Sequence, residues 1–510
     1  MHTKFFWLAA VVGLLFGCGD GDSVNSSQTT DAGWNANGDI VESGEAAESP
    51  EPDDAQSTDS SEEQAKEVAP FYAPEPLNIT SWHVGVISGD DPIYTQLNYG
   101  AFEFPETGLD DVGVVWQEIE ADENGSIGSF GNTLVYAAAR ITVEKDIRAF
   151  ARLNHVYTLF VNGERQPGDI YGAGNARVPI HFNKGENLVV ARAFGGRGNI
   201  QMSFWTTPNE IAFNFADQTH PDLVVGQNRD FPLGVPVLNL SGAVVLDVKA
   251  SVVENEFFQE SHEIFPALAR GAVTQIPFTL RPHAPFEDPE ETVTAVLRIE
   301  APSLEWVYER EVELTTMAAN GAYRRTFRSP VDASVQYYGV LPPSDFDEEK
   351  DYALVLSLHG AAVEAIGQAK AYSQKDWAYI IAPTNRRPYG FDWEEWGHLN
   401  AKSSLDNASA AFNIDPARVY LTGHSMGGHG TWHVGVMNPT RFAAIAPSAG
   451  WNSFYTYGGS PKPSWPFDRA RAHSDTTNYL SNLARRGVYI LHGTADDNVP
   501  ISEGRAMHTA

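Results

Sequence analysis

Residues 418–433 read RVYLTGHSMGGHGTWH and place one serine, Ser425, between an apolar strand-like run and a helix-like run. Glycines stand two residues before and two residues after it, at Gly423 and Gly427. This G-x-S-x-G spacing is typical of a sharp strand-to-helix turn, where a larger side chain at either glycine would collide with nearby backbone. The spacing therefore predicts Ser425 as an exposed nucleophile.

Around this turn, short apolar runs alternate with helix-like stretches. The runs are Tyr352–Leu358 (YALVLSL), Tyr379–Ala382, Val419–Thr422, Phe442–Ala446 and Val488–Leu491. Continuous apolar runs of this length are typical of parallel strands that are buried on both faces. Because they alternate with helical patterns, we expect residues 321–510 to form an α/β domain with a largely parallel sheet.

A serine nucleophile on such a fold needs two backbone N–H donors for the oxyanion and an acidic partner. The N–H of Met426, directly after the nucleophile, is the first expected donor. The second is expected from the loop after YALVLSL, where we assign it to Ala361. The segment HGTADDNVP, residues 492–500, follows a later strand-like run and supplies Asp496 as the expected acid. His492 is expected to be structural.

The catalytic histidine of this fold follows the acid in the chain. His508 is the only histidine after Asp496, and it falls in ISEGRAMHTA, which is typical of a helix. We therefore do not expect His508 to be the base. With ordinary helix, strand and loop lengths, the base is expected roughly 25–40 residues after Asp496. The hydrolase domain is accordingly expected to be truncated at Ala510.

Five segments carry a family resemblance: LSLHGAA, APTNRRPYGFDWEEWG, YLTGHSMGGHGTWH, RFAAIAPSAGW and LHGTADDNVP. Together, over Tyr337–Ala510, they resemble bacterial secreted serine hydrolases grouped with the prolyl oligopeptidase catalytic domain. The resemblance implies a serine peptidase that acts through an acyl-enzyme and needs no cofactor. No blade repeat of a β-propeller is visible. An esterase acting on acyl groups of plant polysaccharide, or a non-catalytic surface adhesin with a dead hydrolase domain, remain alternatives.

Two further groups of residues near the motif carry candidate functions. Arg386, Arg387, Trp393 and Trp396 lie in the loop after a predicted strand, where substrate contacts are common, and we consider them possible substrate-binding residues. His429 and His433 are spaced like a zinc-binding pair. The glutamate of H-E-x-x-H is missing, so helix packing is favoured and no metal is predicted. Residues 451–475 are a candidate lid or cap.

The first 70 residues resemble an export signal followed by a tether. Residues 1–18 contain an apolar run that ends in Leu-Phe-Gly-Cys, which resembles the lipobox of bacterial lipoproteins and implies lipidation at Cys18. Residues 19–70 contain 14 acids and one Lys, without hydrophobic periodicity, and are expected to be a disordered linker. We therefore expect a protein of the bacterial cell envelope that is lipid-anchored to a membrane and faces the periplasm or the exterior.

Two β-rich regions are expected between the tether and the hydrolase domain. Residues 75–210 contain Val161-Asn162-Gly163-Glu164, Gly168-Asp169-Ile170-Tyr171 and Gly185-Glu186-Asn187. This pattern resembles a jelly-roll module of the galactose-binding-like type. Carbohydrate is a possible partner through exposed aromatics such as Trp82 or Trp205, although plain packing of these aromatics is favoured. Residues 211–320 show regularly spaced short strands, including Val293–Glu300 with alternating apolar residues. This spacing is typical of an immunoglobulin-like sandwich, for which a spacer or docking role is expected.

Composition narrows the partners. The 510 residues include 34 Lys and Arg against 66 Asp and Glu, a formal charge of −32. Nucleic-acid binding proteins need clustered cations, so no nucleic acid partner is expected. The chain has one Cys, which excludes an intramolecular disulfide framework and a multi-Cys zinc site.

Overall fold

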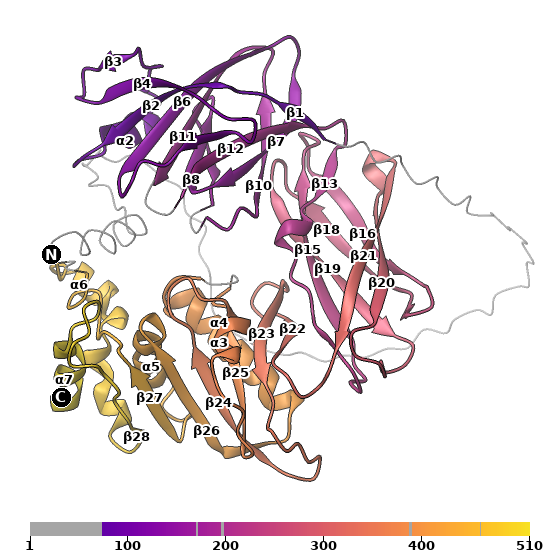
Figure 1. Ribbon diagram of the computed structural model, residues 1–510, viewed down its shortest axis with the longest axis vertical. Helices are drawn as coiled ribbons and strands as arrows, with labels where there is room; N and C mark the ends of the chain where they lie inside the picture. Colours follow the sequence, from indigo (N-terminus) through magenta and orange to yellow (C-terminus); the bar gives the residue numbers. More distant parts are fainter. Residues whose placement is uncertain (1–73, 170–171, 195–197, 387–389, 459–460) are drawn as a thin grey trace, which may run out of the picture.

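The computed structural model describes residues 74–510, except for 170–171, 195–197, 387–389 and 459–460. The predicted signal peptide, Cys18 and the linker of residues 19–70 lie outside the described residues. Figure 1 shows strands of the first region at one end, a second group of strands in the middle and an α/β region at the other end. Along the described residues, none of the helices combines the length and the hydrophobicity required to cross a bilayer.

The first region consists of two sheets. One has the order β1-β12-β7-β10, with β5 paired to β12, and the other has the order β3-β4-β2-β6-β11-β8-β9. Apolar residues from both sheets, including Val135 of β6 and Leu153 of β7, share one buried cluster. The elements are β1 (Glu75–Leu77), β2 (Ser81–Ile87), α2 (Pro92–Asn98), β3 (Gly108–Leu109), β4 (Val115–Glu120), β5 (Ser126–Gly128), β6 (Leu134–Val143), β7 (Ile147–Asn154), β8 (Val156–Val161), β9 (Glu164–Pro167), β10 (Ala176–Phe182), β11 (Gly185–Phe194) and β12 (Ile200–Thr206).

The two tryptophans considered for carbohydrate binding do not form an open platform in this region. Trp82 is fully buried and stacks on Phe204, with ring centroids 6.3 Å apart. Trp82 is therefore a packing residue, as the sequence favoured, because its side chain faces the cluster between the two sheets. Trp205 is half-buried, and the guanidinium of Arg152 lies 4.3 Å from the centre of its ring.

The second region also consists of two sheets, with the orders β13-β15-β19-β17 and β14-β21-β20-β16-β18. The predicted alternation along β20 is confirmed, because Val293, Ala295, Leu297 and Ile299 are all buried in one cluster. The elements are β13 (Ile211–Phe213), η2 (Phe215–Asp217), β14 (Leu223–Val224), β15 (Phe231–Asn239), β16 (Val245–Val253), β17 (Phe258–Gln259), β18 (Ser261–Leu268), β19 (Val273–Pro282), β20 (Thr292–Ala301), η3 (Pro302–Leu304) and β21 (Trp306–Met317).

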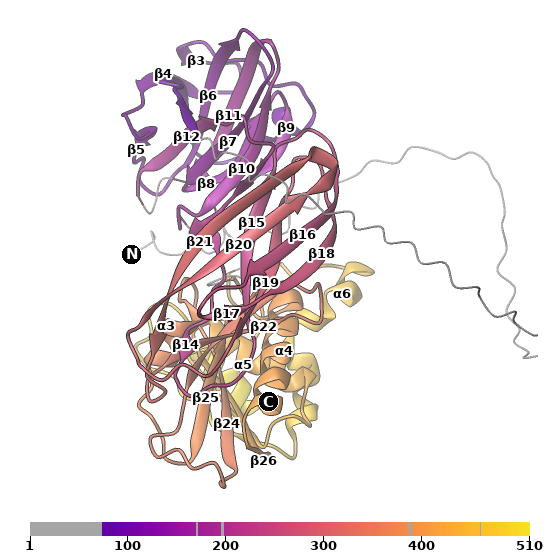
Figure 2. The same cartoon turned by 90° about the vertical axis from the view of Figure 1, so that its right-hand side faces the viewer.

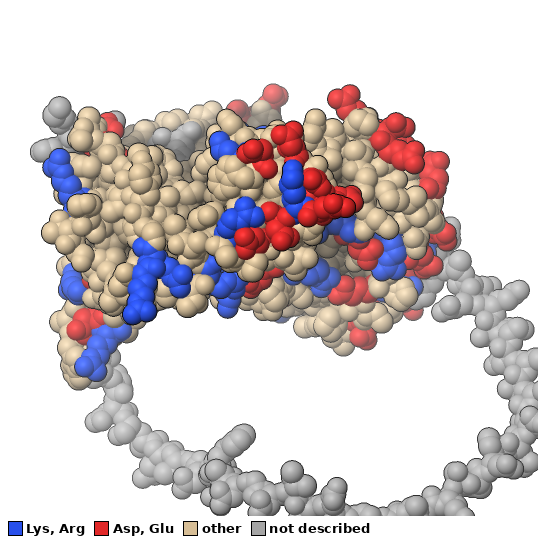
Figure 3. Space-filling view, turned by 90° about the horizontal axis from the view of Figure 1, so that it is seen from below, with Lys and Arg blue, Asp and Glu red and all other residues tan. Residues whose placement is uncertain are grey.

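Direct contacts join the middle region to both of its neighbours. Phe150 of β7 packs with Leu238 and Leu240, at the end of β15. On the other side, the backbone N–H of Val335 donates to Oε1 of Gln275 at 2.7 Å. Figure 3 shows acidic and basic side chains interspersed on the face seen from below, with broad areas that carry neither.

The third region is built on one seven-stranded sheet with the order β22-β23-β25-β24-β26-β27-β28. The strands from β25 to β28 pair in parallel, as predicted, whereas β22 and β23 are antiparallel additions at one edge. The elements are β22 (Tyr323–Arg328), β23 (Val335–Leu341), β24 (Tyr352–Leu358), α3 (Ala365–Lys370), β25 (Ala378–Pro383), α4 (Glu395–Ala411), β26 (Ile414–His424), α5 (Met426–Met437), β27 (Ala444–Ser448), α6 (Phe467–Ala470), η4 (Ala472–Ser474), η5 (Thr476–Leu483), β28 (Gly487–Val488) and α7 (Ile501–Thr509).

Helices cover both faces of this sheet. Neighbouring residues of a strand point to opposite faces, and on β23 Tyr337 packs against Ile366 of α3. The hydroxyl of the next residue, Tyr338, donates to Oδ1 of Asn407 on α4 at 2.9 Å. Thus α3 and α4 lie on opposite faces, an arrangement that can be followed in Figure 2.

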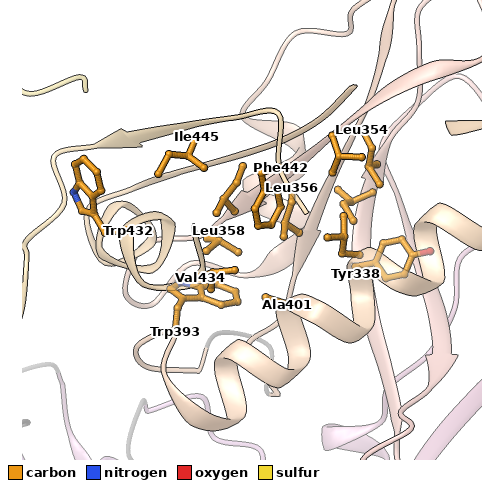
Figure 4. Packing of buried hydrophobic residues seen from close by; sticks show 14 of the residues in the cluster. Tyr338, Leu354, Leu356, Leu358, Trp393, Ala401, Trp432, Val434, Phe442 and Ile445 are labelled. Carbon is orange, nitrogen blue, oxygen red and sulfur yellow. The ribbon is translucent and has the colours of Figure 1, made fainter. Parts of the chain in front are cut away.

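The main core lies between β24, α4 and α5. Figure 4 shows Leu354, Leu356 and Leu358 of β24 facing Ala401 of α4 and Val434 of α5. All five side chains are buried. Burying apolar surface at about 25 cal/mol per Å² makes this cluster the main source of the domain's stability, and it holds the strand ends of the site in fixed positions.

The last predicted strand is shorter than expected. β28 ends at Val488. Beyond it, the N–H groups of Tyr489 and Leu491 still donate to the carbonyl oxygens of Ile445 and Pro447 on β27, at 3.0 and 3.1 Å. Val488, Tyr489 and Leu491 are exposed rather than buried. Among the described residues β28 is an edge strand, so its outer side lacks the neighbour that covers the inner strands.

Candidate active site

Ser425 occupies a strained turn between β26 and α5. Its backbone has φ 58° and ψ −117°, a left-handed conformation that non-glycine residues rarely adopt. A Cβ at Gly423 would lie 2.4 Å from the carbonyl oxygen of Gly427, and one at Gly427 would lie 1.9 Å from that of Leu358. Both glycines are therefore required by contact with backbone, which is the physical basis of the G-x-S-x-G spacing.

The loop after β24 lies against the nucleophile. A Cβ built on Gly360 would be 3.9 Å from Cβ of Ser425, so the backbone of residues 359–361 forms one wall beside the serine. Met426 is the first residue of α5, and N–H groups in a first helical turn have no partner within their helix. The structure thus brings the two predicted sources of oxyanion donors, Met426 and the loop with Ala361, to the same serine.

Trp393 supports the loop after β24. Its Nε1–H donates to the carbonyl oxygen of His359 at 3.1 Å, and its ring centroid lies 4.9 Å from that of His359. Both side chains are fully buried, and burial lowers the pKa of His359. Trp393 is therefore placed under the loop, where it cannot face a substrate, because its indole fills space next to Gly430 on α5.

The other predicted substrate-binding residues have different surroundings. Nη1 of Arg386 donates to Oγ of Ser329 at 3.0 Å, and its guanidinium also pairs with Asp332. The same guanidinium lies over the ring of Trp396, 5.1 Å from its centre. Trp396 is exposed. Arg387 lies outside the described residues.

Backbone strain is concentrated at this edge of the sheet. Thirteen non-glycine residues of the described chain have positive φ, and seven of them follow the carboxyl ends of the parallel strands. Each such residue costs about 1–3 kcal/mol and persists only where the surrounding structure enforces it, which happens most often at functional sites. These seven are Ala362, Asn385, Arg386, Asp392, Glu395, Ser425 and Ala449.

Residues 492–500, which contain the predicted acid Asp496 and are called the acid loop below, follow β28 at the same edge of the sheet. Oδ1 of Asp496 accepts the backbone N–H groups of Asn498 and Val499, both at 3.0 Å. Nε2 of His492 donates to the carbonyl oxygen of Val499 at 2.9 Å and lies 3.6 Å from Oδ2 of Asp496. Through these contacts the loop holds one carboxylate oxygen in place, and His492 acts as a support of the loop.

Backbone hydrogen bonds at the end of β27 connect the segment before the acid loop to the nucleophile. The N–H of Ser425 donates to the carbonyl oxygen of Ser448 at 2.9 Å, and the N–H of Ala449 donates to that of Leu491 at 2.8 Å. Ser425, Ala449 and Asp496 therefore follow neighbouring parallel strands at one sheet edge. His508 lies exposed in the last turn of α7, and within the described residues no histidine is hydrogen-bonded to Oγ of Ser425.

A buried polar cluster behind the nucleophile was not predicted. Nε2 of His429 lies 3.3 Å from Oε1 of Glu394, and Oγ of Ser474 donates to Oε2 of the same carboxylate at 2.5 Å. Burial opposes the ionisation of Glu394, but the hydrogen bond and charge of His429 outweigh it and lower the pKa of Glu394 to about 2. The only sequence signal was a group of three acidic residues among three aromatic residues in the stretch FDWEEW, residues 391–396.

The second carboxylate of this loop behaves in the opposite way. Burial and the nearby charge of Glu394 raise the pKa of Asp392 to about 7. The backbone N–H of Asp392 donates to Sδ of Met426 at 3.1 Å, so the backbone of this residue lies beside the first turn of α5. Like charges a few ångströms apart in a low-dielectric site do not both ionise readily, and here Glu394 takes the charge.

The histidine pair considered for zinc packs inside the domain. His429 and His433 are both buried, with ring centroids 6.3 Å apart. Burial and the charges of neighbouring histidines lower the pKa of His433 to about 3. In the part of the chain that the structure describes, no group of three or more His, Cys, Asp or Glu side chains is arranged to hold a metal ion.

The strained serine between β26 and α5, the adjacent backbone donors and the acid loop, on a mostly parallel sheet, define a serine hydrolase domain of the α/β-hydrolase type. The sequence model of the prolyl oligopeptidase family matches residues 379–510. This match covers the loop after β25, the nucleophile and the acid loop.

Two curated proteins share part of this sequence. A protein of Arthroderma benhamiae described as an uncharacterized secreted protein is 29% identical over 211 residues, which cover 36% of this chain and 22% of that protein. Poly(3-hydroxyalkanoate) depolymerase C of Paucimonas lemoignei is 33% identical over 117 residues, which cover 19% of this chain and 27% of the depolymerase. The chain thus spans about a quarter of the length of these relatives.

Among solved structures, a thermostable esterase is similar to this chain. It has 16% sequence identity and a TM-score of 0.28, and the match covers 57% of this chain and 86% of the esterase.

Proposed function

We propose that this protein is a serine hydrolase in which Ser425 attacks a carbonyl carbon of the substrate and forms an acyl-enzyme that water then cleaves. The proton of Oγ would pass to a histidine base oriented by Asp496; among the described residues no histidine is hydrogen-bonded to this oxygen, so the proposal assigns the base to none of them. The N–H groups of Met426 and Ala361 stabilise the oxyanion, an effect worth about 3–4 kcal/mol per donor in related mechanisms. The observation that carries the proposal is the backbone of Ser425, held at φ 58° between β26 and α5 beside Gly360.

An ester is the proposed substrate, ahead of the peptide that the sequence resemblance favoured. The relative named as a poly(3-hydroxyalkanoate) depolymerase supports ester cleavage. Among the described residues, the β-rich part forms four sheets in two facing pairs, not a ring of blades such as a prolyl oligopeptidase propeller. Peptide cleavage remains the second candidate, supported by the prolyl oligopeptidase model over residues 379–510.

The finer organisation is part of the same proposal. Residues 1–18 would direct export and leave Cys18 lipidated, and residues 19–70 would hold the folded part clear of the membrane surface. The two pairs of sheets would be a jelly-roll module at 75–210 and an immunoglobulin-like module at 211–320, ahead of the catalytic domain at 321–510. The relative described as secreted supports export.

The test compares the wild type with Ser425→Ala and with the control Ser403→Ala, which removes a hydroxyl from the exposed face of α4. A fluorophosphonate probe should label the wild type and the control but not Ser425→Ala. Hydrolysis of p-nitrophenyl acetate should fall by about 10⁶-fold in that variant, and esters should be cleaved faster than proline-containing peptides. Labelling or turnover above a tenth of wild type in folded Ser425→Ala would refute the nucleophile.

A further inference from the structure

Trp396 has an exposed aromatic side chain, and one face of its ring contacts a neighbouring side chain. It is 55% exposed and lies in the first turn of α4. The guanidinium of Arg386 covers one face of its ring, 5.1 Å from the centre. Arg386 is itself held by Ser329 and Asp332, at the turn between β22 and β23. One face of the indole is therefore covered by Arg386, whose position is set by Ser329 and Asp332.

A short loop, residues 392–396, connects Trp396 to residues that contact the surroundings of Ser425. Asp392, four residues before Trp396, donates its N–H to Sδ of Met426 at 3.1 Å, and Trp393 donates to the carbonyl of His359 at 3.1 Å. Four residues span at most roughly 15 Å between Cα atoms. A substrate that reaches from Ser425 to Trp396 therefore needs to be only a few rings long.

The charges at this place favour an uncharged ring. The positive charge of Arg386 is compensated by Asp332, so it is not available to attract an anion. The residue before Trp396, Glu395, has an exposed carboxylate and a strained backbone with φ 42°. Strain of this kind concentrates where a conformation is needed for function. The exposed indole offers a flat surface for stacking, and the exposed carboxylate of the preceding residue offers an acceptor for hydroxyl groups.

We propose that Trp396 and Glu395 form a subsite for a neutral pyranose ring, so that the ester cleaved at Ser425 is carried by a polysaccharide. The ring stacks its C–H face on the open side of the indole, and its hydroxyl groups donate to the carboxylate of Glu395. This subsite rests on the proposed ester hydrolase function and names its substrate class. Trp396 acts in binding and does not touch the reacting atoms.

Hydroxyl-radical footprinting of the full chain, read by mass spectrometry, tests binding at this residue without requiring turnover. Neutral xylo- and cello-oligosaccharides should reduce the oxidation of Trp396 several-fold. Trp377 is the matched control, because it is 46% exposed and precedes β25 at the opposite end of the strand. Its oxidation should not change.

Variants measure the contribution to affinity and to turnover. Trp396→Ala should raise the KM for an acetylated xylo-oligosaccharide by about ten-fold, equivalent to roughly 1.4 kcal/mol at 25 °C, with little change in kcat. Trp396→Phe should restore most of the affinity, and Trp377→Ala should match the wild type.

Three results would overturn the subsite: absence of protection by every neutral oligosaccharide, equal KM values for Trp396→Ala and Trp377→Ala, or protection of Trp396 by a proline-containing peptide or polygalacturonate alone. The outcome is separable from that of the proposed function. If oligosaccharides protect Trp396 but the protein cleaves no ester, the proposed activity is refuted and the subsite stands. If the protein cleaves esters but its KM does not depend on Trp396, the subsite is refuted and the proposed activity stands.

Discussion

Nε2 of His429, on the helix that begins after Ser425, lies 3.3 Å from Oε1 of Glu394, and both side chains are buried. The other ring nitrogen of His429, Nδ1, donates to the carbonyl oxygen of Trp451 at 3.1 Å. Both ring nitrogens thus face oxygen atoms of the protein. The pair joins α5, the loop before α4 and, through Ser474, the segment after α6.

Removing the charge of Glu394 should destabilise the catalytic domain. We expect Glu394→Gln to lower the free energy of unfolding by about 3–5 kcal/mol at pH 7, because it leaves His429 without its buried partner. Urea unfolding followed by circular dichroism measures the change. The control is Asp406→Asn, which breaks a pair between exposed Asp406 and Arg441 and should cost at most about 1 kcal/mol.

The contribution of Glu394 should also depend on pH in a defined direction. Its pKa in the folded protein, about 2, lies below the ordinary value of 4.5. The carboxylate therefore stabilises the fold fully above the ordinary value, and this stabilisation is lost as the pH falls toward 2. The difference in stability between wild type and Glu394→Gln should shrink between pH 6 and pH 3. An equal difference at both values would contradict a charged pair.

Asp392 should behave in the opposite sense. Its pKa in the folded protein, about 7, lies above the ordinary value of 3.8, so its contribution is fully present below the ordinary value and is lost as the pH rises through 7. Asp392→Asn keeps the oxygen that accepts the N–H of Glu394 and removes the charge. We expect it to stabilise the protein at pH 8.5, by an amount on the order of 4 kcal/mol, and much less at pH 4. Thermal melts at both pH values measure this; equal gains would refute it.

Two glycines of the site should respond differently to the same added methyl group. Gly427→Ala places a Cβ 1.9 Å from the carbonyl oxygen of Leu358, and this backbone cannot yield without moving β24. Gly360→Ala places one 3.5 Å from the nearest atom, the carbonyl oxygen of His424, which is ordinary contact. We expect Gly427→Ala to lose the fold, at a cost above the about 1–3 kcal/mol of common overpacking, and Gly360→Ala to fold like the wild type.

Gly360→Ala should show how much room the site leaves for the acyl group next to Ser425. The added methyl of Gly360→Ala would lie 3.9 Å from Cβ of Ser425, so it narrows the place where an acyl group binds. We expect kcat/KM to fall more for p-nitrophenyl butyrate than for p-nitrophenyl acetate. A thermal melt shows folding and a stopped assay with both esters shows the selectivity; an unchanged ratio would place the acyl group elsewhere.

The membrane anchor can be tested at the only cysteine of the chain. Cys18 lies outside the described residues, and its lipidation is proposed from the Leu-Phe-Gly-Cys sequence before the acidic tether. We expect labelled palmitate to be incorporated into the wild type and not into Cys18→Ala, which should leave the membrane fraction or retain its signal sequence. A wild-type protein that is exported but takes up no palmitate would refute the anchor.

Sequence patterns located much of the sheet because burial on both faces leaves a local trace. The run Tyr352–Leu358 is β24 residue for residue. The run Val488–Leu491 was predicted in the same way, but the named strand ends at Val488 and its outer side is exposed. Position at the sheet edge is not visible in the residues of the strand itself.

Side-chain environment was harder to predict than the position of strands. Trp393 and Trp396 stand three residues apart in one aromatic stretch, yet the first is fully buried under the loop after β24 and the second is exposed over Arg386. The sequence presents both as aromatic residues of a catalytic loop. Their separation into a support and an open surface depends on where α5 and the turn between β22 and β23 lie.

By itself, the sequence determined the strand–serine–helix turn and the parallel strands around it, because each depends on backbone geometry within a few residues. Only the tertiary structure decided that Glu394 meets His429, 35 positions away, and Ser474, 80 positions away. These contacts depend on the order of the strands in the sheet and on which helix covers which face. Coulombic and hydrogen-bonding energies act over distance in space, so no spacing along the chain reveals them.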